Sequence, residues 1–256
     1  MTFRRSFQYK KTEISYLVLG TATGEPILML HGMLGTFERE LACMVPYFSD
    51  YQLVCPDIPA HGASTGATLD PRHTAEAMIA LCEHLALPRV HVFGYSFGGF
   101  VGLMMAERRP DVVNALMMHA TRFFWTQPEA DEFAANLRPE VLAENNPRWV
   151  EVLREDHAPQ GADHWKELCS IASTYVATLP ESMSTFDVST IATPVCVSCG
   201  DRDAMLPIRE VEQLAGMLPC GSLAVIPGSA HPMQETQTGA LAGVALELFR
   251  AHSIFS

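Results

Sequence analysis

The segment 94–98, with the sequence GYSFG, has the pattern G-x-S-x-G, which is typical of a strand, a sharp turn and a helix in immediate succession. The β-branched and aromatic residues 90–93 predict the strand, and residues 100–109 predict a helix that ends at Pro110. The two glycines leave space beside a serine whose backbone is held in an unusual conformation. This segment therefore predicts that Ser96 is an exposed nucleophile at a strand-to-helix bend.

Size and charge exclude several classes of function. A chain of 256 residues with 48% hydrophobic residues can form one large domain with a packed core. Its formal net charge of -12 would repel nucleic-acid phosphates and anionic lipid headgroups. No apolar run reaches the roughly 20 residues that span a bilayer, and residues 1–5 do not begin a signal peptide. We therefore expect a cytoplasmic protein with a small-molecule substrate, and no nucleic-acid or membrane partner.

The seven cysteines are an odd, scattered set that is not typical of a disulfide framework. We expect reduced thiols that pack as small apolar side chains in the core. Cys196 and Cys199 match C-x-x-C, but both lie in a predicted strand, where residues three apart point to opposite faces. This spacing disfavours a shared metal or a redox pair.

Strand and helix patterns alternate along most of the chain, which is typical of an α/β fold with a mostly parallel sheet and helices on both faces. The later strands are nearly continuous apolar runs, as expected for strands that are buried on both faces. Helices are predicted around residues 78–85, before Pro88, and over residues 239–249. Eight segments predict strands: 3–9, 14–19, 27–30, 52–55, 90–93, 113–118, 195–199 and 223–226.

Residues 121–187 interrupt this alternation, because they contain several helical patterns and no convincing strand. We interpret them as an inserted helical cap, or lid, on a core made of residues 1–120 and 188–256. Within the insertion Asp163 is placed to cap the start of a helix. An apolar stripe follows at helical spacing, and we expect most of its members to pack onto the core. The stripe consists of Trp165, Leu168, Ile171 or Ala172, Tyr175 and Leu179.

A serine hydroxyl becomes a good nucleophile only when a base takes its proton and an acid holds that base. His231 lies in a turn-rich loop directly after the last predicted strand, and we expect it to be the general base. The preceding strand ends in the sequence GDRD, which makes Asp203 the first choice for the acid and Asp201 the second. The strand that ends near residues 119–121 has no carboxylate at its tip.

Acyl transfer also needs hydrogen-bond donors for the developing oxyanion, each worth about 3 kcal/mol of the barrier. The backbone N–H of Phe97, at the start of the helix after Ser96, is one expected donor. The other is the N–H of Met33, in the loop 31–35 that follows a predicted strand. We expect His31 to shape this loop and not to act as a base.

Together, the loop 31–35, the segment 57–64 (DIPAHGAS), the elbow 94–98, the turn 200–203 and His231 resemble the α/β-hydrolase superfamily over nearly the whole chain. The chain order Ser, Asp, His is also that of α/β-hydrolases. The resemblance implies an eight-stranded, mostly parallel sheet, a helical lid between the sixth and seventh strands, and no cofactor.

Two positions are informative within this resemblance. Ala60 departs from the glycine that capped members often have in their D-x-x-G-H-G-x-S loop, and we expect it to stiffen the turn without affecting catalysis. A serine at position 96 disfavours the related haloalkane dehalogenases and epoxide hydrolases, which have an aspartate nucleophile there.

The reactions that remain after this exclusion use the same catalytic groups. They are hydrolysis of an ester, thioester, lactone or amide, and cleavage of a carbon–carbon bond beside a ketone. The alternative is a small-molecule receptor or signalling protein of the same fold, in which turnover is slow or incidental. Aromatic residues of the cap indicate an apolar portion of the substrate. The candidates for the pocket wall are Trp125, Trp149, Trp165 and Tyr175.

The cap also contains two Asp-His pairs, at residues 156–157 and 163–164. Pro159 and Gly161 interrupt any helix between them, and Asp163 is already explained as a helix cap. We therefore predict no metal site at these pairs.

Overall fold

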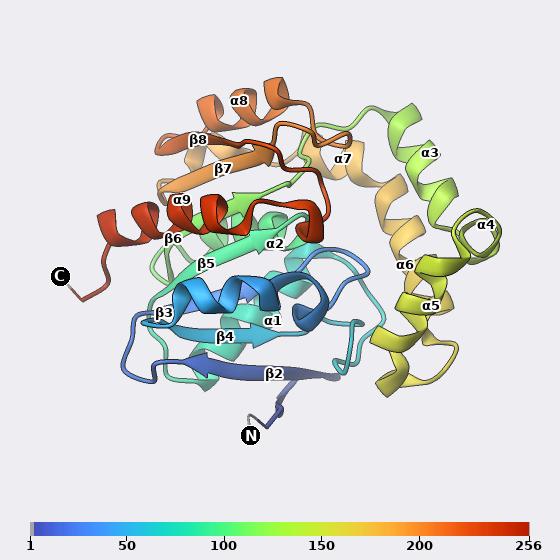
Figure 1. The fold of residues 1–256 in the computed structure, drawn as a ribbon, viewed down its shortest axis with the longest axis horizontal. Coiled ribbons are helices and arrows are strands. Elements are labelled where there is room, and N and C mark those ends of the chain that lie inside the picture. The colour runs from blue at the N-terminus through green and yellow to red at the C-terminus, as the bar shows by residue number, and fades with distance from the viewer. Residues whose placement is uncertain (1–2, 256) are drawn as a thin grey trace.

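An eight-stranded sheet forms the centre of the computed structural model, which describes residues 3–255 (Figure 1). The strand order is β1-β2-β4-β3-β5-β6-β7-β8. The pairs β1–β2 and β2–β4 are antiparallel and all the others are parallel. The strands are β1 Arg5–Tyr9, β2 Thr12–Gly20, β3 Pro26–Leu30, β4 Gln52–Pro56, β5 Val90–Tyr95, β6 Val113–His119, β7 Val195–Gly200 and β8 Gly221–Ile226. The predicted α/β class and all eight predicted strands are confirmed.

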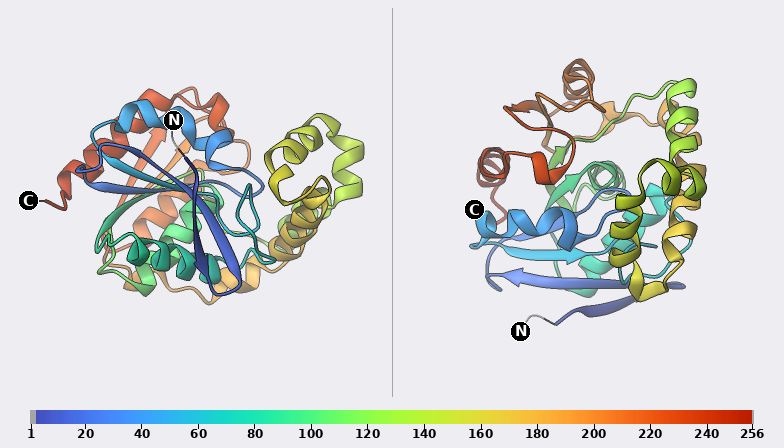
Figure 2. Two further views of the ribbon diagram at one scale, coloured as in Figure 1. Left: turned by 90° about the horizontal axis from the view of Figure 1, so that it is seen from below. Right: turned by 45° about the vertical axis from the view of Figure 1, so that its right-hand side comes forward.

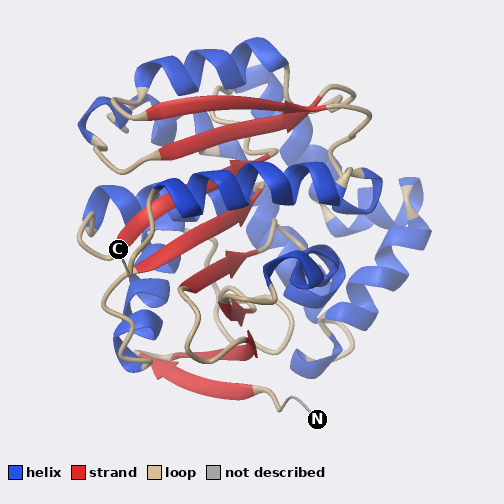
Figure 3. Cartoon of the chain, turned by 60° about the vertical axis from the view of Figure 1, so that its left-hand side comes forward, coloured by secondary structure: helices blue, strands red, loops and turns tan. Residues whose placement is uncertain are grey.

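Helices cover both faces of this sheet (Figure 3). Helices α1, α2 and α8 pack one hydrophobic core against one face, and α9 with the short helices η1 and η2 packs a second core against the other. Because β5, β6 and β7 lie between two cores, every residue in them is buried. The bounds are η1 Phe37–Leu41, η2 Ala42–Phe48, α1 Pro71–His84, α2 Phe97–Arg108, α8 Ile208–Met217 and α9 Thr238–Ala251.

Strand β8 does not follow the prediction that the later strands are buried on both faces. It pairs only with β7, so it is an edge strand, and Leu223 is 44% exposed. An apolar run can thus lie at an edge as well as in the centre of a sheet.

The cysteines are only partly as predicted. All seven are free thiols, and Cys196 and Cys199 lie in the two different cores, on opposite faces of β7. Cys43 and Cys220, however, are exposed, so the expectation that all seven are core residues is wrong for these two. Both lie outside the strands: Cys43 in the short helix η2 and Cys220 directly before β8.

Between β6 and β7 the chain forms a group of helices that stands beyond the carboxyl ends of the parallel strands (Figures 1 and 2). We call residues 121–187 the cap segment; no strand is described within it. Across residues 3–255 no helix has the length and apolar character needed to cross a membrane. The elements of the cap segment are α3 Gln127–Leu137, α4 Pro139–Asn145, α5 Pro147–Asp156, η3 Ala158–Gln160, α6 His164–Ala177 and α7 Leu179–Ser184.

Asp163 stands at the N-cap position, directly before α6, as predicted, but its side chain does not cap the helix. Its backbone, at φ -107° and ψ 2°, is not in the extended conformation that a capping residue adopts. The carboxylate instead forms an ion pair with Lys166, one turn along the helix, at 2.7 Å.

Candidate active site

Ser96 lies between the last residue of β5 and the first residue of α2, with φ 50° and ψ -116°. A positive φ costs a non-glycine residue about 1–3 kcal/mol, so the surrounding backbone must impose it. A Cβ atom at Gly98 would lie 2.1 Å from the carbonyl oxygen of Leu30, and one at Gly94 would lie 2.4 Å from the Cα atom of Gly99. The helix can therefore leave the sheet at this angle only with glycine at both positions.

Asp203 and His231 come from the loops after β7 and β8, and the structure places them in contact. The Nδ1 atom of His231 lies 2.9 Å from Oδ2 of Asp203. The other carboxylate oxygen accepts hydrogen bonds from the backbone N–H groups of Met205, at 2.8 Å, and Leu206, at 3.0 Å. Burial alone would raise the pKa of Asp203, but the hydrogen bond to His231 and these two amides lower it below its usual value. The buried carboxyl is therefore ionised and fully hydrogen-bonded.

Asp201, the second choice for the acid, has a different position. Its Oδ1 atom accepts a hydrogen bond from the backbone N–H of Ser229 at 3.2 Å. It thus supports the loop that carries His231 without touching the ring. The hydroxyl of Tyr95 donates to the backbone oxygen of His231 at 3.0 Å and holds the same loop from the other side.

The loop 31–35 has one backbone N–H without a partner between two that are bonded. The N–H of Gly32 donates to Oε2 of Glu40 at 2.6 Å, and that of Leu34 donates to Nε2 of His61 at 3.0 Å. Within residues 3–255 the N–H of Met33 donates to no acceptor, and neither does that of Phe97 in the first turn of α2. Both residues line the cavity that contains Ser96, so these two amides are available to a bound group.

As predicted, His31 shapes this loop. Its Nε2 atom accepts a hydrogen bond from the N–H of Ile58 at 3.0 Å, and its Nδ1 atom lies 2.8 Å from the carbonyl oxygen of Gly32. The ring must therefore carry its proton on Nδ1 and donate it to Gly32. Burial lowers the pKa of His31 to about 4, so the ring stays neutral.

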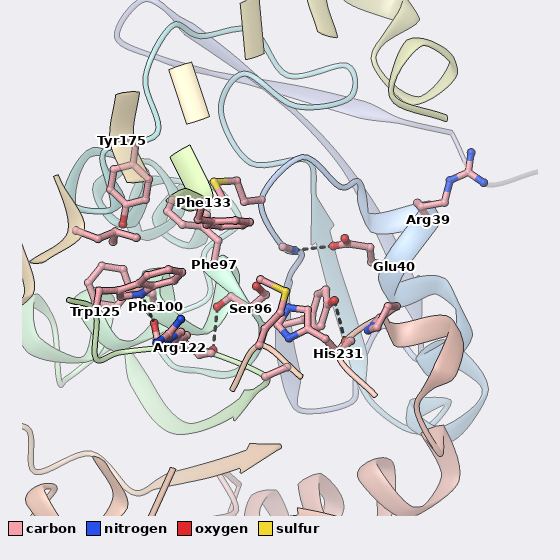
Figure 4. A pocket seen from close by; sticks show the side chains of 18 of the residues that line it. Arg39, Glu40, Ser96, Phe97, Phe100, Arg122, Trp125, Phe133, Tyr175 and His231 are labelled. Carbon is pink, nitrogen blue, oxygen red and sulfur yellow. Dashed lines mark hydrogen bonds between the residues drawn. The ribbon is translucent and has the colours of Figure 1, made fainter. Parts of the chain in front are cut away.

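A cavity of about 650 Å³ opens above Ser96 and His231. Figure 4 shows that aromatic residues lie to one side of Ser96, namely Phe97, Phe100, Trp125, Phe133 and Tyr175, while Arg39 and Glu40 lie to the other. On the aromatic side the ring of Trp125 stacks on Phe133, with centroids 5.6 Å apart. The aromatic and apolar residues of the wall include Phe97, Phe100, Trp125, Phe133, Trp149, Val152, Tyr175, Leu179 and Met183.

Three of the four aromatic residues predicted for the pocket wall line this cavity: Trp125, Trp149 and Tyr175. Trp165 does not, so that prediction is wrong. Its side chain is 3% exposed, and it lies at the start of α6 against the α4 and α5 side of the cap segment. The sequence interpretation also missed charged residues in the wall, namely Arg39, Glu40 and Arg122.

Each residue of the two Asp-His pairs is held by a protein group. Asp156 forms a bidentate ion pair with Arg39, whose Nη2 lies 2.7 Å from Oδ1. His157 accepts from the N–H of Gly62 at 2.8 Å, and His164 donates to the carbonyl oxygen of Ala60 at 2.8 Å. Within residues 3–255 no three His, Cys, Asp or Glu side chains are grouped so that they could hold a metal ion.

Glu40 contributes a carboxyl group to the cavity wall. Burial raises its pKa to about 8, although the hydrogen bond from Gly32 acts in the opposite direction. Because the folded protein holds this proton more tightly than the unfolded chain, the free energy of unfolding should fall as the pH rises from 4.5 to about 8. Above that pH the carboxylate is charged, next to the loop that contains Met33.

We expect hydrolytic activity to decline above about pH 8, because a carboxylate at Glu40 would repel the developing oxyanion. The variant Glu40→Gln keeps an acceptor for Gly32 and cannot ionise, so its pH profile should lose this alkaline decline. Initial rates from pH 6 to 10 measure the effect, with the exposed Glu38→Gln on the same turn as control. An identical alkaline decline in both variants would contradict the prediction.

The chain belongs to the alpha/beta hydrolase fold family, whose model matches residues 25–165. Among curated proteins it is 24% identical to 3-oxoadipate enol-lactonase 2 of Acinetobacter baylyi, over 89% of this chain and 90% of the relative. It is 29% identical to the pimeloyl-(acyl-carrier protein) methyl ester esterase of Chromobacterium violaceum, over 81% of this chain and 87% of the relative.

Solved structures show the same fold. The 2-hydroxy-6-oxo-6-phenylhexa-2,4-dienoate hydrolase of a Rhodococcus strain superimposes with a TM-score of 0.80 at 17% identity, covering 98% of this chain and 99% of that one. An esterase from Thermogutta terrifontis gives a TM-score of 0.76 at 23% identity, covering 99% of this chain and 100% of that one. Fold, family and relatives identify the chain as an α/β-hydrolase enzyme.

Proposed function

We propose that this α/β-hydrolase is a serine hydrolase of a small-molecule ester or a related carbonyl substrate: a thioester, a lactone or a carbon–carbon bond beside a ketone. The observation that carries the proposal is the 2.9 Å hydrogen bond between His231 and the ionised Asp203, in loops that bring the ring to the same cavity as Ser96. The strained backbone of Ser96 at the end of β5 adds support, because such strain is maintained only where the surrounding structure imposes it.

In the proposed mechanism His231 takes the proton of Ser96 while the serine oxygen attacks the substrate carbonyl carbon. The carbonyl becomes an oxyanion, which accepts hydrogen bonds from the N–H groups of Met33 and Phe97. The protonated ring then donates its proton to the leaving oxygen, sulfur or carbon atom, and an acyl-enzyme remains. Water, activated by the same ring, releases the acid and restores Ser96. Asp203 fixes the ring with its proton on Nδ1 and stabilises the charged ring. The scheme requires no cofactor or metal.

The cap segment 121–187 is proposed to be a lid on a core of residues 1–120 and 188–256, and to select the substrate. Its aromatic side chains support an apolar substrate portion on that side of Ser96. The enol-lactonase and the methyl ester esterase among the relatives act on bonds of the ester type by name, which favours esters and lactones within the proposed range. The receptor alternative gains no support from these two relatives, because both are named as enzymes.

The proposal is tested by labelling with a fluorophosphonate, which reacts with activated serines. We expect the intact mass of the wild-type protein to increase by one adduct, and peptide mapping to locate it on Ser96. Ser96→Ala should take up no label, while Ser170→Ala, at an exposed serine of the cap segment, should label like the wild type. No adduct on folded protein, or an adduct on another residue, would contradict the assignment. A panel of esters, thioesters, lactones and diketones then identifies the bond that is cleaved.

A further inference from the structure

Three segments that are distant in sequence meet behind Met33. They are the loop 31–35, the loop 57–64 after β4, and residues 157–164 of the cap segment. Figure 1 shows the lower ends of α5 and α6 beside the loops that follow β3 and β4. Histidine rings fill the junction: His31 and His61 are 5.2 Å apart between centroids, and His61 and His157 are 5.8 Å apart.

Leu34, directly after Met33, is held by two of these rings. Its N–H donates to Nε2 of His61 at 3.0 Å, and its carbonyl oxygen lies 3.1 Å from Nε2 of His157. The residue has φ 67°, in the left-handed region that a leucine rarely adopts. Both of its backbone polar groups are therefore fixed in a conformation that leucine does not favour by itself.

The proton positions on both rings follow from their partners. The Nδ1 atom of His61 faces the carbonyl oxygen of Pro59 at 2.9 Å, so it donates, and Nε2 is free to accept from Leu34. In His157 the roles are reversed: Nδ1 accepts from the N–H of Gly62 at 2.8 Å, so Nε2 carries the proton that is donated to Leu34. Each ring thus makes two hydrogen bonds and is neutral. Burial lowers the pKa of both, which agrees with this assignment.

The same stretch of the cap segment also fixes the loop that carries His61. The carbonyl oxygen of Ala60 accepts hydrogen bonds from His164 at 2.8 Å and from Gln160 at 3.2 Å. Ala60 has φ 69°, so it too is held in the left-handed region. The cap segment therefore reaches Leu34 by two routes: directly through His157, and indirectly through Ala60 and His61.

The backbone on both sides of Met33 is held by hydrogen bonds. The preceding peptide group is held by His31 at the carbonyl oxygen of Gly32, and the following one by His61 at the N–H of Leu34. In a trans peptide the N–H points opposite to the carbonyl. A carbonyl of Gly32 that faces His31 therefore directs the N–H of Met33 the other way.

We propose that His157 is a positioning residue for the oxyanion site: the cap segment, through His157, holds Leu34 in its left-handed conformation and so aims the N–H of Met33 at the substrate oxygen. The proposal rests on the proposed function, because it needs the Met33 amide as an oxyanion donor. It gives the cap segment a second role in addition to binding the substrate. Closure of the cap would complete the catalytic site as well as cover it.

Two substitutions separate the two hydrogen bonds of His157. In His157→Gln the side-chain amide nitrogen takes the place of Nε2 and can still donate to Leu34. In His157→Asn the side-chain oxygen takes the place of Nδ1 and can still accept from Gly62, but no donor reaches Leu34. His91→Asn is the matched control, because His91 is also a buried, hydrogen-bonded histidine and it pairs with Glu25 at 3.1 Å, outside the cavity.

The measurements are kcat and KM for the best ester of the panel, and the inhibition constant of a trifluoromethyl ketone with the same acyl group, which forms an oxyanion on attack by Ser96. Complete loss of an oxyanion donor lowers kcat by about 10²–10³. His157→Asn should leave the N–H of Met33 in place but poorly oriented. We therefore expect it to lower kcat about tenfold to a hundredfold with little change in KM. The inhibitor should weaken by a similar factor. His157→Gln should stay within about threefold of the wild type.

Equal loss of kcat in His157→Asn, His157→Gln and His91→Asn would overturn the proposal, since it would indicate general destabilisation. So would a His157→Asn enzyme with unchanged inhibitor affinity. If His157→Asn does not fold, His61→Asn applies the same test at the N–H of Leu34. The shorter side chain can still donate to the carbonyl oxygen of Pro59 but places no acceptor near Leu34, so the same fall in kcat is expected. A wild-type protein that neither hydrolyses the panel nor labels at Ser96 would instead refute the proposed function, and with it this inference.

Discussion

Replacing Ser96 by alanine is expected to lower kcat for ester hydrolysis by about a million-fold while the fold is retained. The variant loses the atom that forms the acyl-enzyme, and only direct attack by water remains. The amides of Met33 and Phe97 would still stabilise an oxyanion, so a residual rate about 10³–10⁴ above that in water is expected. Alanine has the same constraint on φ as serine, so the strain at this position is unchanged.

The measurement is the steady-state rate on the best substrate of the panel, with far-UV circular dichroism and the free energy of unfolding as checks on the fold. Ser170→Ala serves as the matched control and should keep full activity. A Ser96→Ala enzyme with more than a few per cent of wild-type kcat would show that another group is the nucleophile.

The second large effect is expected from Asp203→Asn, which should lower kcat by about 10⁴ with little change in stability. The Oδ1 atom of Asp203 accepts from the N–H groups of Met205 and Leu206, so the new asparagine would keep its oxygen there. Its NH₂ group would then face Nδ1 of His231. That nitrogen would have to accept, and the ring proton would move to Nε2, where it prevents the ring from acting as a base.

Asp201→Asn is the matched control, because it changes an acid two residues away with the same loss of charge. Its oxygen can still accept from the N–H of Ser229, and we expect kcat to stay within about tenfold of the wild type. Steady-state kinetics on both variants decide between the two acids. If Asp201→Asn is the more damaging change, the assignment of Asp203 is wrong.

Much of the fold could be predicted from local pattern. The eight strands are short β-branched or apolar runs between turn residues, and their observed ends differ from the predicted ones by at most two residues. Burial was harder to predict, because it depends on neighbours and not on the strand itself. The apolar β8 has the composition of a central strand, yet it pairs on one side only.

The candidate site, too, could be predicted from the sequence only in part. Ser96 and His231 each stand in a local setting that the sequence displays, a glycine elbow and a turn after a strand. The choice between Asp201 and Asp203 depends on the path of the loop after β7, which no local pattern encodes. Trp165 and Trp149 are similar in sequence context, but one faces α4 and α5 and the other faces the cavity. Which side of a cap helix is turned inward depends on packing between helices.

The hydrogen bonds that hold Leu34 could not be predicted from the sequence, for a further reason. His157 lies 123 residues from Leu34 and 95 residues from Gly62, so no spacing along the chain indicates that these groups meet. In the sequence, His157 belongs to an Asp-His pair for which no metal site is predicted. The structure gives it two backbone partners in the core instead.

The insertion of the cap segment between β6 and β7 has a consequence for how enzymes of this kind can diversify. These two strands are adjacent and parallel, so the chain leaves the sheet at the carboxyl end of β6 and re-enters it at the amino end of the neighbouring β7. The insertion can lengthen or shorten without shifting the register of any strand. A cap grafted from another enzyme would therefore be accepted by the sheet, but it would restore turnover only if it also carried a donor for the carbonyl oxygen of Leu34.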